Sequence, residues 1–165
     1  FKISSVPQIG GFFSDLSAED NLNAVGEILI KDLKKRKLKI EELISKFELD
    51  AVRKVEAKFL SGGMKRRLVI SMSLLGEPEI LLMDEPLAAL DPQTIQMLQT
   101  IIIKLQSEYN LTILITDHQA RDLLVVCDKA VILSNSRIVA EGTPNQLMQN
   151  DNAAKYYFGD NFKFK

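Results

Sequence analysis

One stretch, from Leu60 to Asp91, constrains the fold more than any other part of the sequence: LSGGMKRRLVISMSLLGEPEILLMDEPLAALD. It begins with a small-residue loop whose backbone N–H groups face no bulky side chain, Ser61, Gly62 and Gly63. Apolar residues then recur at helical spacing, which predicts one apolar helix face made of Met64, Leu68, Met72 and Leu75. Pro78 pushes the residue before it out of the α region, so the helix is expected to end there.

A short apolar run follows, Ile80 to Met83, and predicts a strand that is buried on both faces. Two adjacent acids, Asp84 and Glu85, come directly after it. Open α/β sheets bind their ligands at the carboxyl ends of strands, and a helix N-terminus favours anions. Together the glycine loop with its helix and the strand with its acid pair indicate a site for phosphate and a divalent cation. Either half alone is explained better by a surface loop, a core helix and a solvated acid pair.

Three segments of this stretch carry a family resemblance. LSGG followed by a basic helix is similar to the signature motif of ATP-binding-cassette (ABC) ATPases, and ILLMDEP resembles their Walker B segment. The four residues from Ala88 to Asp91 resemble the D-loop that follows. The resemblance implies an α/β fold, the C-terminal part of a RecA-like P-loop NTPase domain with a helical subdomain.

The resemblance also implies roles for individual residues, with ATP and Mg²⁺ as cofactors. Asp84 would bind the metal, directly or through water, and Glu85 would act as general base on the attacking water. The signature loop would close over ATP held by the other subunit of a head-to-tail homodimer. The residues that would contact nucleotide are Ser61, Gly62, Gly63 and Asp91.

Two further site residues follow strands. Gln8 comes after a short β-capable segment, at the place of the family's Q-loop glutamine, which contacts both the metal and the water. A lone glutamine after a strand is usually only a loop residue. His118, the one histidine, ends a Thr-Asp-His sequence that matches the family's H-loop, whose histidine touches the terminal phosphate. It follows a second fully apolar strand, Leu111 to Ile115.

The segment between Gln8 and the signature loop predicts helices. Ser17 is a candidate N-cap, followed by one helix face made of Leu22, Val25, Leu29 and Leu33. The basic run from Lys34 to Lys37 is interpreted as a solvated helix end or loop, and a second amphipathic helix is expected from Ile40 to Leu49. By resemblance this region meets a membrane partner's coupling helix, although its apolar positions could equally form core.

The last third predicts a helix capped by Asp91, a hairpin turning at 134–136 and a short helix after Thr143. The segment LITDHQARDLLVVCDKAVILSNSRIVAEGTPNQL and the aromatic tail YYFGDNFKF resemble lipopolysaccharide-export ATPase subunits within the family. This resemblance implies permease subunits as partners and a position on the cytoplasmic, inner face of the cell membrane.

Composition excludes some classes of protein. The net charge of −1 gives no basic field for nucleic acid, so no nucleic-acid partner is expected. The single cysteine, Cys127, excludes an intrachain disulfide framework. No apolar run reaches the roughly 20 residues that a membrane-spanning helix needs.

The P-loop pattern G-x-x-x-x-G-K-S/T is absent from the sequence. By resemblance the chain is therefore a fragment that lacks the Walker A region, with a Q-loop strand at 1–13, a helical subdomain at 14–76 and the Walker B, D-loop and H-loop core at 77–165. Such a fragment alone is expected to be inactive and to expose strand edges. The alternatives are a truncated, non-catalytic cassette remnant or a soluble ABC protein outside transport. Met64 stands where the family has Gln or Glu, so the capping box of the signature helix cannot be completed.

Overall fold

A computed structural model describes residues 2–150 of the chain. The chain divides into two compact units, Phe1–Asp117 and His118–Lys165. The aromatic tail at 156–162 lies outside the described residues. The first unit contains every predicted site residue except His118.

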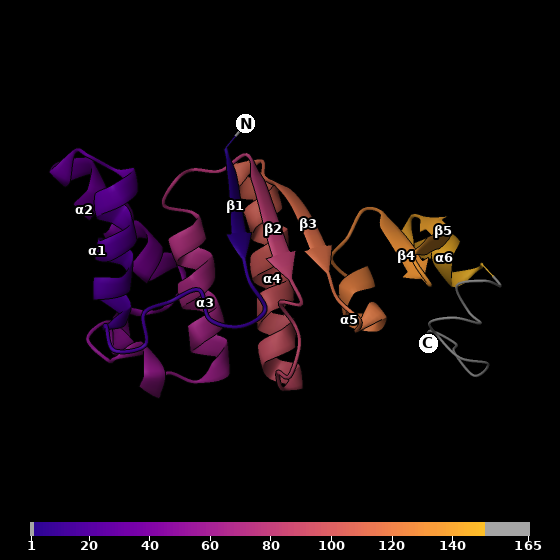
Figure 1. Ribbon diagram of the computed structural model, residues 1–165, viewed down its shortest axis with the longest axis horizontal. Helices are drawn as coiled ribbons and strands as arrows, with labels where there is room; N and C mark the ends of the chain where they lie inside the picture. Colours follow the sequence, from indigo (N-terminus) through magenta and orange to yellow (C-terminus); the bar gives the residue numbers. More distant parts are fainter. Residues whose placement is uncertain (1, 151–165) are drawn as a thin grey trace. The chain divides into compact units, whose positions relative to one another are not determined.

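A three-stranded parallel sheet forms the centre of the first unit (Figure 1). Its order is β1 (Ile3–Val6), β2 (Ile80–Asp84) and β3 (Thr112–Thr116), with Val6 opposite Met83 and Asp84 opposite Thr116. Because all three strands run in the same direction, their carboxyl ends lie at one edge of the sheet. The segments that follow β1, β2 and β3 therefore begin side by side, although they are far apart in sequence.

The prediction that the strand at Ile80–Met83 is buried on both faces is wrong for the described residues, and the neighbouring strand is exposed on one side as well. In β2, Leu81 and Met83 are buried, whereas Leu82 is 37% exposed; in β3, Leu114 is 61% exposed. Helix α4 (Pro92–Tyr109) runs behind the sheet in Figure 1 and presents its own apolar face, Ile95, Leu98, Ile102 and Leu105. Within the described part of this unit, side chains on the opposite face are left exposed. A continuous apolar run does not distinguish one covered face from two.

Helices α1 (Ala18–Leu29) and α2 (Leu33–Lys46) fill the segment between the first two strands. Ser17 caps α1 as predicted, since its hydroxyl accepts a hydrogen bond from the Asp20 N–H at 3.1 Å. The helix does not continue to Leu33. Asp32 interrupts it and caps α2 by accepting from the Lys35 N–H at 2.8 Å.

Helix α2 therefore begins seven residues before the predicted Ile40. The basic run at 34–37 forms its first turns and is mostly exposed, which agrees with a solvated helix end. The residues predicted to face inward are buried, namely Leu43, Ile44 and Phe47. Sequence periodicity thus identified the buried face of this helix but not its first residue.

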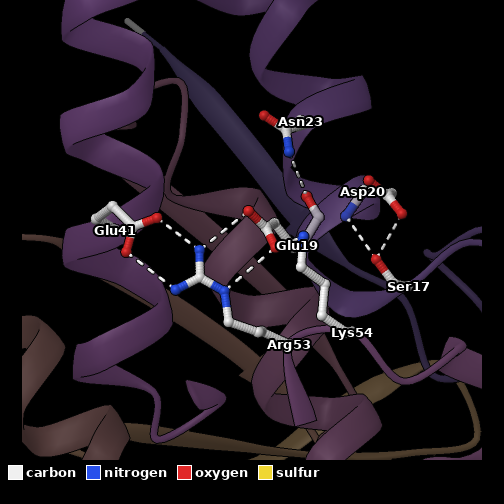
Figure 2. Close-up of polar contacts among 7 residues, drawn as sticks. All are labelled: Ser17, Glu19, Asp20, Asn23, Glu41, Arg53 and Lys54. Atoms are coloured by element: carbon white, nitrogen blue, oxygen red, sulfur yellow. Dashed lines mark hydrogen bonds and ion pairs between the residues drawn. The ribbon is translucent and has the colours of Figure 1, made fainter. Parts of the chain in front are cut away.

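One arginine joins these two helices, as Figure 2 shows. Arg53 follows a short 3₁₀ helix, η1 (Asp50–Val52), and its guanidinium binds Glu19 of α1 and Glu41 of α2. Lys54 adds a second cation beside Glu19. Hydrogen bonds from Arg53 and Lys54 lower the pKa of Glu19 from 4.5 to about 2.

A buried asparagine holds the loop that leads into α1. Asn21 accepts from the Phe13 N–H at 2.7 Å and donates to the carbonyls of Phe13, Leu16 and Ser17 at 3.0, 3.2 and 3.0 Å. Its side chain is fully buried and its amide uses both donor hydrogens and its oxygen. The loop after β1 is thereby attached to the first turn of the helix.

The signature segment forms α3 (Gly62–Ser73), preceded by the 3₁₀ helix η2 (Ala57–Phe59). Leu68 and Met72 are buried as predicted, and so are Val69 and Ile70, so the helix packs on a wider face than the sequence pattern indicated. The chain then turns before β2 with Glu77 in a left-handed conformation.

The second unit is a small α/β body. It contains α5 (Ala120–Leu124), the hairpin β4 (Ala130–Ser134) and β5 (Arg137–Gly142), and α6 (Pro144–Met148). The predicted hairpin is confirmed, with Asn135 and Ser136 both at positive φ. Its core is formed by Leu124, Ile132, Ala140 and Leu147.

We expect Asn21→Leu to lower the free energy of unfolding by about 2 kcal/mol, because it leaves buried backbone groups of the β1–α1 loop unpaired. Urea unfolding followed by circular dichroism measures this. Asn23→Leu is the matched control, since the Asn23 amide makes one hydrogen bond, to the Glu19 carbonyl at 3.0 Å. Equal losses in the two variants would contradict the anchoring role of Asn21.

The Arg53 cluster predicts a pH-dependent stability. The pKa of Glu19 is 4.5 when unfolded and about 2 when folded, so its contribution is complete above pH 4.5 and is lost as the pH falls towards 2. Replacing Arg53 by Met should therefore reduce the unfolding free energy at neutral pH by about 1 kcal/mol, a difference that shrinks in acid. Lys37→Met removes an exposed charge outside the cluster and should show no such pH dependence.

Candidate functional site

The loops that leave β1 and β2 meet through a side-chain contact. The Gln8 Nε2 donates to Glu85 Oε2 at 2.7 Å, joining residues 77 positions apart. Glu85 has a φ of +43°, which is uncommon for a residue with a side chain, while its N–H donates to the Thr116 carbonyl at 2.8 Å. The predicted pair of Gln8 and Glu85 is thus brought together at the carboxyl edge of the sheet.

The last residue of β2 and the loop after it are attached to the end of β3. Asp84 Oδ1 accepts a hydrogen bond from the Thr116 hydroxyl at 2.6 Å, and Asp117 Oδ2 accepts from the Leu87 N–H at 3.2 Å. In the sequence, Thr116 and Asp117 stand out only as neighbours of His118. Their position directly after an apolar strand, the same position that identified Asp84, was the available indication.

A third residue that the sequence did not single out is Arg66, in the second turn of α3. Its guanidinium donates to the carbonyls of Pro7 at 2.8 Å and Gln8 at 3.0 Å, with a longer contact to the Glu85 carbonyl at 3.5 Å. Burial lowers the pKa of this guanidinium, and the charge of Asp117 opposes the change. The sequence showed only that this helix is basic.

Ser61 caps the N-terminus of α3. Its hydroxyl accepts from the Met64 N–H at 3.3 Å, so the helix start keeps the serine half of a capping box. Methionine has no group that could return a bond to the Ser61 backbone, as expected from the sequence. The N–H groups at the start of α3 have no partner within the helix, which makes this end suited to an anion.

The two glycines of the loop differ in their surroundings. A Cβ built on Gly63 would lie 2.8 Å from the Thr94 Cγ2, whereas one on Gly62 would lie 3.4 Å from the Leu90 Cδ2. Of these two positions, only 63 therefore requires glycine, because it packs closely against the first turn of α4. Because Gly63 carries a hydrogen atom where alanine would carry a methyl group, the signature loop can lie against the start of α4.

Asp91 caps α4, as the sequence predicted. Its carboxylate accepts hydrogen bonds from the Thr94 hydroxyl and from the N–H groups of Thr94 and Gln93, the latter two at 3.0 and 3.1 Å. The Thr94 hydroxyl is the largest cause of a lowered pKa at Asp91, followed by the Thr94 N–H. The same threonine thus donates a hydrogen bond to Asp91 and fills the space beside Gly63.

A hollow of about 300 Å³ lies beside these contacts. The loop after β1, helix α3 and the segment at 88–90 line it, including Gln8, Gly62, Arg66 and Leu90. Residues of the predicted Q-loop, signature motif and D-loop therefore border a common space in the first unit.

His118 is the first residue of the second unit and follows β3 by two positions. The acid pair and Gln8 belong to the first unit. The part of the structure that brings Gln8, Asp84 and Glu85 together does not include the histidine, and its predicted role remains a prediction.

The donor set at the sheet edge fits magnesium. Asp84, Glu85 and Gln8 offer carboxylate and amide oxygens, the ligand type that Mg²⁺ prefers. Within residues 2–150 no group of three or more His, Cys, Asp or Glu side chains could hold a metal. A site with few protein ligands is typical of Mg²⁺, which keeps waters and shares substrate phosphates.

Comparison with known proteins identifies the family. The family model described as ABC transporter matches residues 1–88, more than half of the 165-residue chain. The chain belongs to the ABC transporter family. This is the family that the signature, Walker B and D-loop resemblances predicted.

Curated relatives include ATP-binding proteins of lipopolysaccharide export. The lipopolysaccharide export system ATP-binding protein LptB of Haemophilus influenzae is 39% identical over 98% of this chain and 67% of its own length. LptB of Escherichia coli K12 is 36% identical over the same shares. An uncharacterized ABC transporter ATP-binding protein of Rhizobium meliloti is 34% identical over 97% of this chain and 59% of its own. The chain thus spans about two thirds of these relatives or less, and it is of the LptB type.

Solved structures agree on the fold. CbiO1 of Clostridium perfringens, part of the cbiONQ ABC transporter complex, superposes with a TM-score of 0.83 at 23% identity, over 93% of this chain and 62% of its own. An inward-facing metal-chelate type ABC transporter has the same TM-score at 22% identity, over 95% and 64%. Among residues 2–150, no helix has the length and apolar character to cross a membrane.

We expect Gly63→Ala to lower the unfolding free energy by about 1–3 kcal/mol, because the new methyl group collides with Thr94. Thr94→Ser removes the Cγ2 methyl and retains the hydroxyl that contacts Asp91. The alanine substitution should therefore cost much less in a Thr94→Ser background, as measured by urea unfolding. Gly62→Ala, which meets ordinary packing, is the control; an equal cost at both glycines would refute the close-packing explanation.

Proposed function

We propose that the intact protein binds and hydrolyses ATP as the nucleotide-binding subunit of an ABC transporter, and that it powers lipopolysaccharide export. The observation that carries the proposal is the hydrogen bond between Gln8 and Glu85, beside Asp84, at the carboxyl edge of a parallel sheet. A carboxylate in this position, oriented by an amide, suits a general base acting on water.

In this proposal each of the chain's own site residues has a separate role. Glu85 accepts the proton of the attacking water, and the Gln8 amide orients its carboxylate through the 2.7 Å hydrogen bond. Asp84, oriented by the Thr116 hydroxyl, would hold Mg²⁺ together with Gln8. The metal, when bound, neutralises charge that develops on the phosphates.

The remaining predicted residues act on the nucleotide. Ser61, Gly62 and Gly63 present the N-terminus of α3 to the phosphates of ATP held by a second copy of the protein, which gives a homodimer with nucleotide between the subunits. Asp91 shapes the loop beside them, and His118 contacts the terminal phosphate. Hydrolysis then separates the two subunits, and the change of state is passed to the transporter.

The transport partners are membrane permease subunits, and the protein binds them from the cytoplasmic face of the membrane. Support for lipopolysaccharide as the cargo comes from the relatives named for its export, at 36–39% identity. The helical subdomain, residues 14–76, carries the surface that meets the permease. Phe59 in this subdomain and Phe13 just before it are among the exposed apolar side chains that such a contact would cover.

Glu85→Gln tests the proposal in the protein expressed from its complete reading frame. The amide cannot accept the water's proton, so kcat for ATP hydrolysis should fall by roughly 100-fold or more, with ATP binding retained. Phosphate release and binding of a fluorescent ATP analogue measure the two quantities.

Glu79→Gln is the matched control. Glu79 is exposed and lies just before the opposite end of the same strand, so this change should leave kcat unaltered. If the wild type binds ATP but does not hydrolyse it, the enzyme proposal is refuted and a non-catalytic cassette is favoured. Undiminished activity in Glu85→Gln would remove Glu85 as the base.

A further inference from the structure

Arg66 donates hydrogen bonds to the backbone of two segments that are far apart in the sequence, the one after β1 and the one after β2. Two of its nitrogens donate to the carbonyls of Pro7 and Gln8, at 2.8 and 3.0 Å, and one of them also lies 3.5 Å from the Glu85 carbonyl. One guanidinium on α3 therefore contacts the main chain of both residues whose side chains meet at the sheet edge.

The loop after Gln8 turns through two consecutive glycines. Gly10 and Gly11 follow at φ of +78° and +81°, conformations that glycine adopts without strain and that allow the loop to turn away from β1. A Cβ on Gly11 would lie 3.0 Å from a methyl group of Val69, one turn beyond Arg66. Helix α3 thus lies against this loop at two successive turns.

The bonds from Arg66 also lie in a sheltered place. The side chain is about half buried, and burial lowers its pKa while Asp117 supplies a compensating negative charge. Hydrogen bonds from a charged donor are stronger than neutral ones, and partial burial protects them from competition with water. The planar guanidinium can serve several carbonyls at once, which an ammonium on a flexible stem does less well.

We propose that Arg66 is a positioning residue, which fixes the backbone of Gln8 relative to that of Glu85 so that the amide of one stays bonded to the carboxylate of the other. The inference rests on the proposed function, because it assigns to Arg66 the alignment of the proposed base. Arg66 itself touches no reacting atom.

Hydrogen–deuterium exchange on the protein from its complete reading frame tests the structural half without requiring activity. Arg66→Gln should raise amide exchange in the loop at 8–13 and at 85–90, and Arg66→Lys should raise it less. Arg67→Gln is the matched control, because Arg67 on the same helix binds the Phe47 carbonyl and Glu48 instead. The proposal is overturned if Arg66→Gln exchanges at the wild-type rate in the two loops. It is also overturned if Arg67→Gln raises exchange there as much as Arg66→Gln does.

A kinetic double-mutant cycle tests the functional half. Arg66→Gln should lower kcat about tenfold with the KM for ATP changed less than threefold, since small misplacements of catalytic groups cost rate. In a Gln8→Ala background, where the contact to be aligned is absent, the same substitution should lower kcat threefold or less. A tenfold loss in both backgrounds would show a merely structural effect and overturn the positioning role.

The two halves separate this inference from the proposed function. If the wild type does not hydrolyse ATP, the enzyme proposal fails, and the exchange data alone decide whether Arg66 fixes the two loops. If the wild type is active and Arg66→Gln retains full kcat, the enzyme proposal stands and the positioning role falls.

Discussion

Parallel pairing of β1, β2 and β3 is the constraint on which the candidate site depends. The three strands begin at residues 3, 80 and 112, and only their common direction places the ends at one edge. The pairing extends past β2, because the Glu85 N–H still donates to the Thr116 carbonyl. Glu85 then adopts a left-handed backbone, which costs about 1–3 kcal/mol and directs the chain into the next loop. The strain is tolerated where neighbouring contacts hold the residue.

Much of the site could be predicted from the sequence because its residues occupy positions defined by local pattern. Glu85 follows an apolar strand, Ser61 precedes a helix, and Asp91 stands before a first-turn proline; capping by Ser61 and Asp91 is observed. Local pattern failed where the outcome depends on a partner far away in the chain. Nothing around Arg66 indicates that its acceptors are the carbonyls of Pro7 and Gln8, 59 and 58 positions earlier.

The two errors in the fold have the same origin. The apolar run of β2 was compatible with one covered face or two, and the neighbouring strand and helix decide between them. Leu33 continues the spacing of the α1 face, yet Asp32 offers a carboxylate that caps a new helix, and the cap prevails over the periodicity. Apolar spacing identified the buried side of α2 but not the whole of that of α1, where Leu29 is 50% exposed, whereas polar side chains at the ends determine where each helix begins.

Asp91 and Gly63 show how a helix cap can also set the geometry of the signature loop. The Asp91 carboxylate accepts three hydrogen bonds in capping α4, which uses most of its acceptor capacity within its own chain. One of the donors is the Thr94 hydroxyl, and the methyl group of the same threonine occupies the space that a Cβ on Gly63 would need. The cap thus fixes the threonine, and the threonine limits how closely the signature loop approaches α4. Any effect of Asp91 on nucleotide is therefore transmitted largely through the position of the loop, and its carboxylate need not touch the ligand.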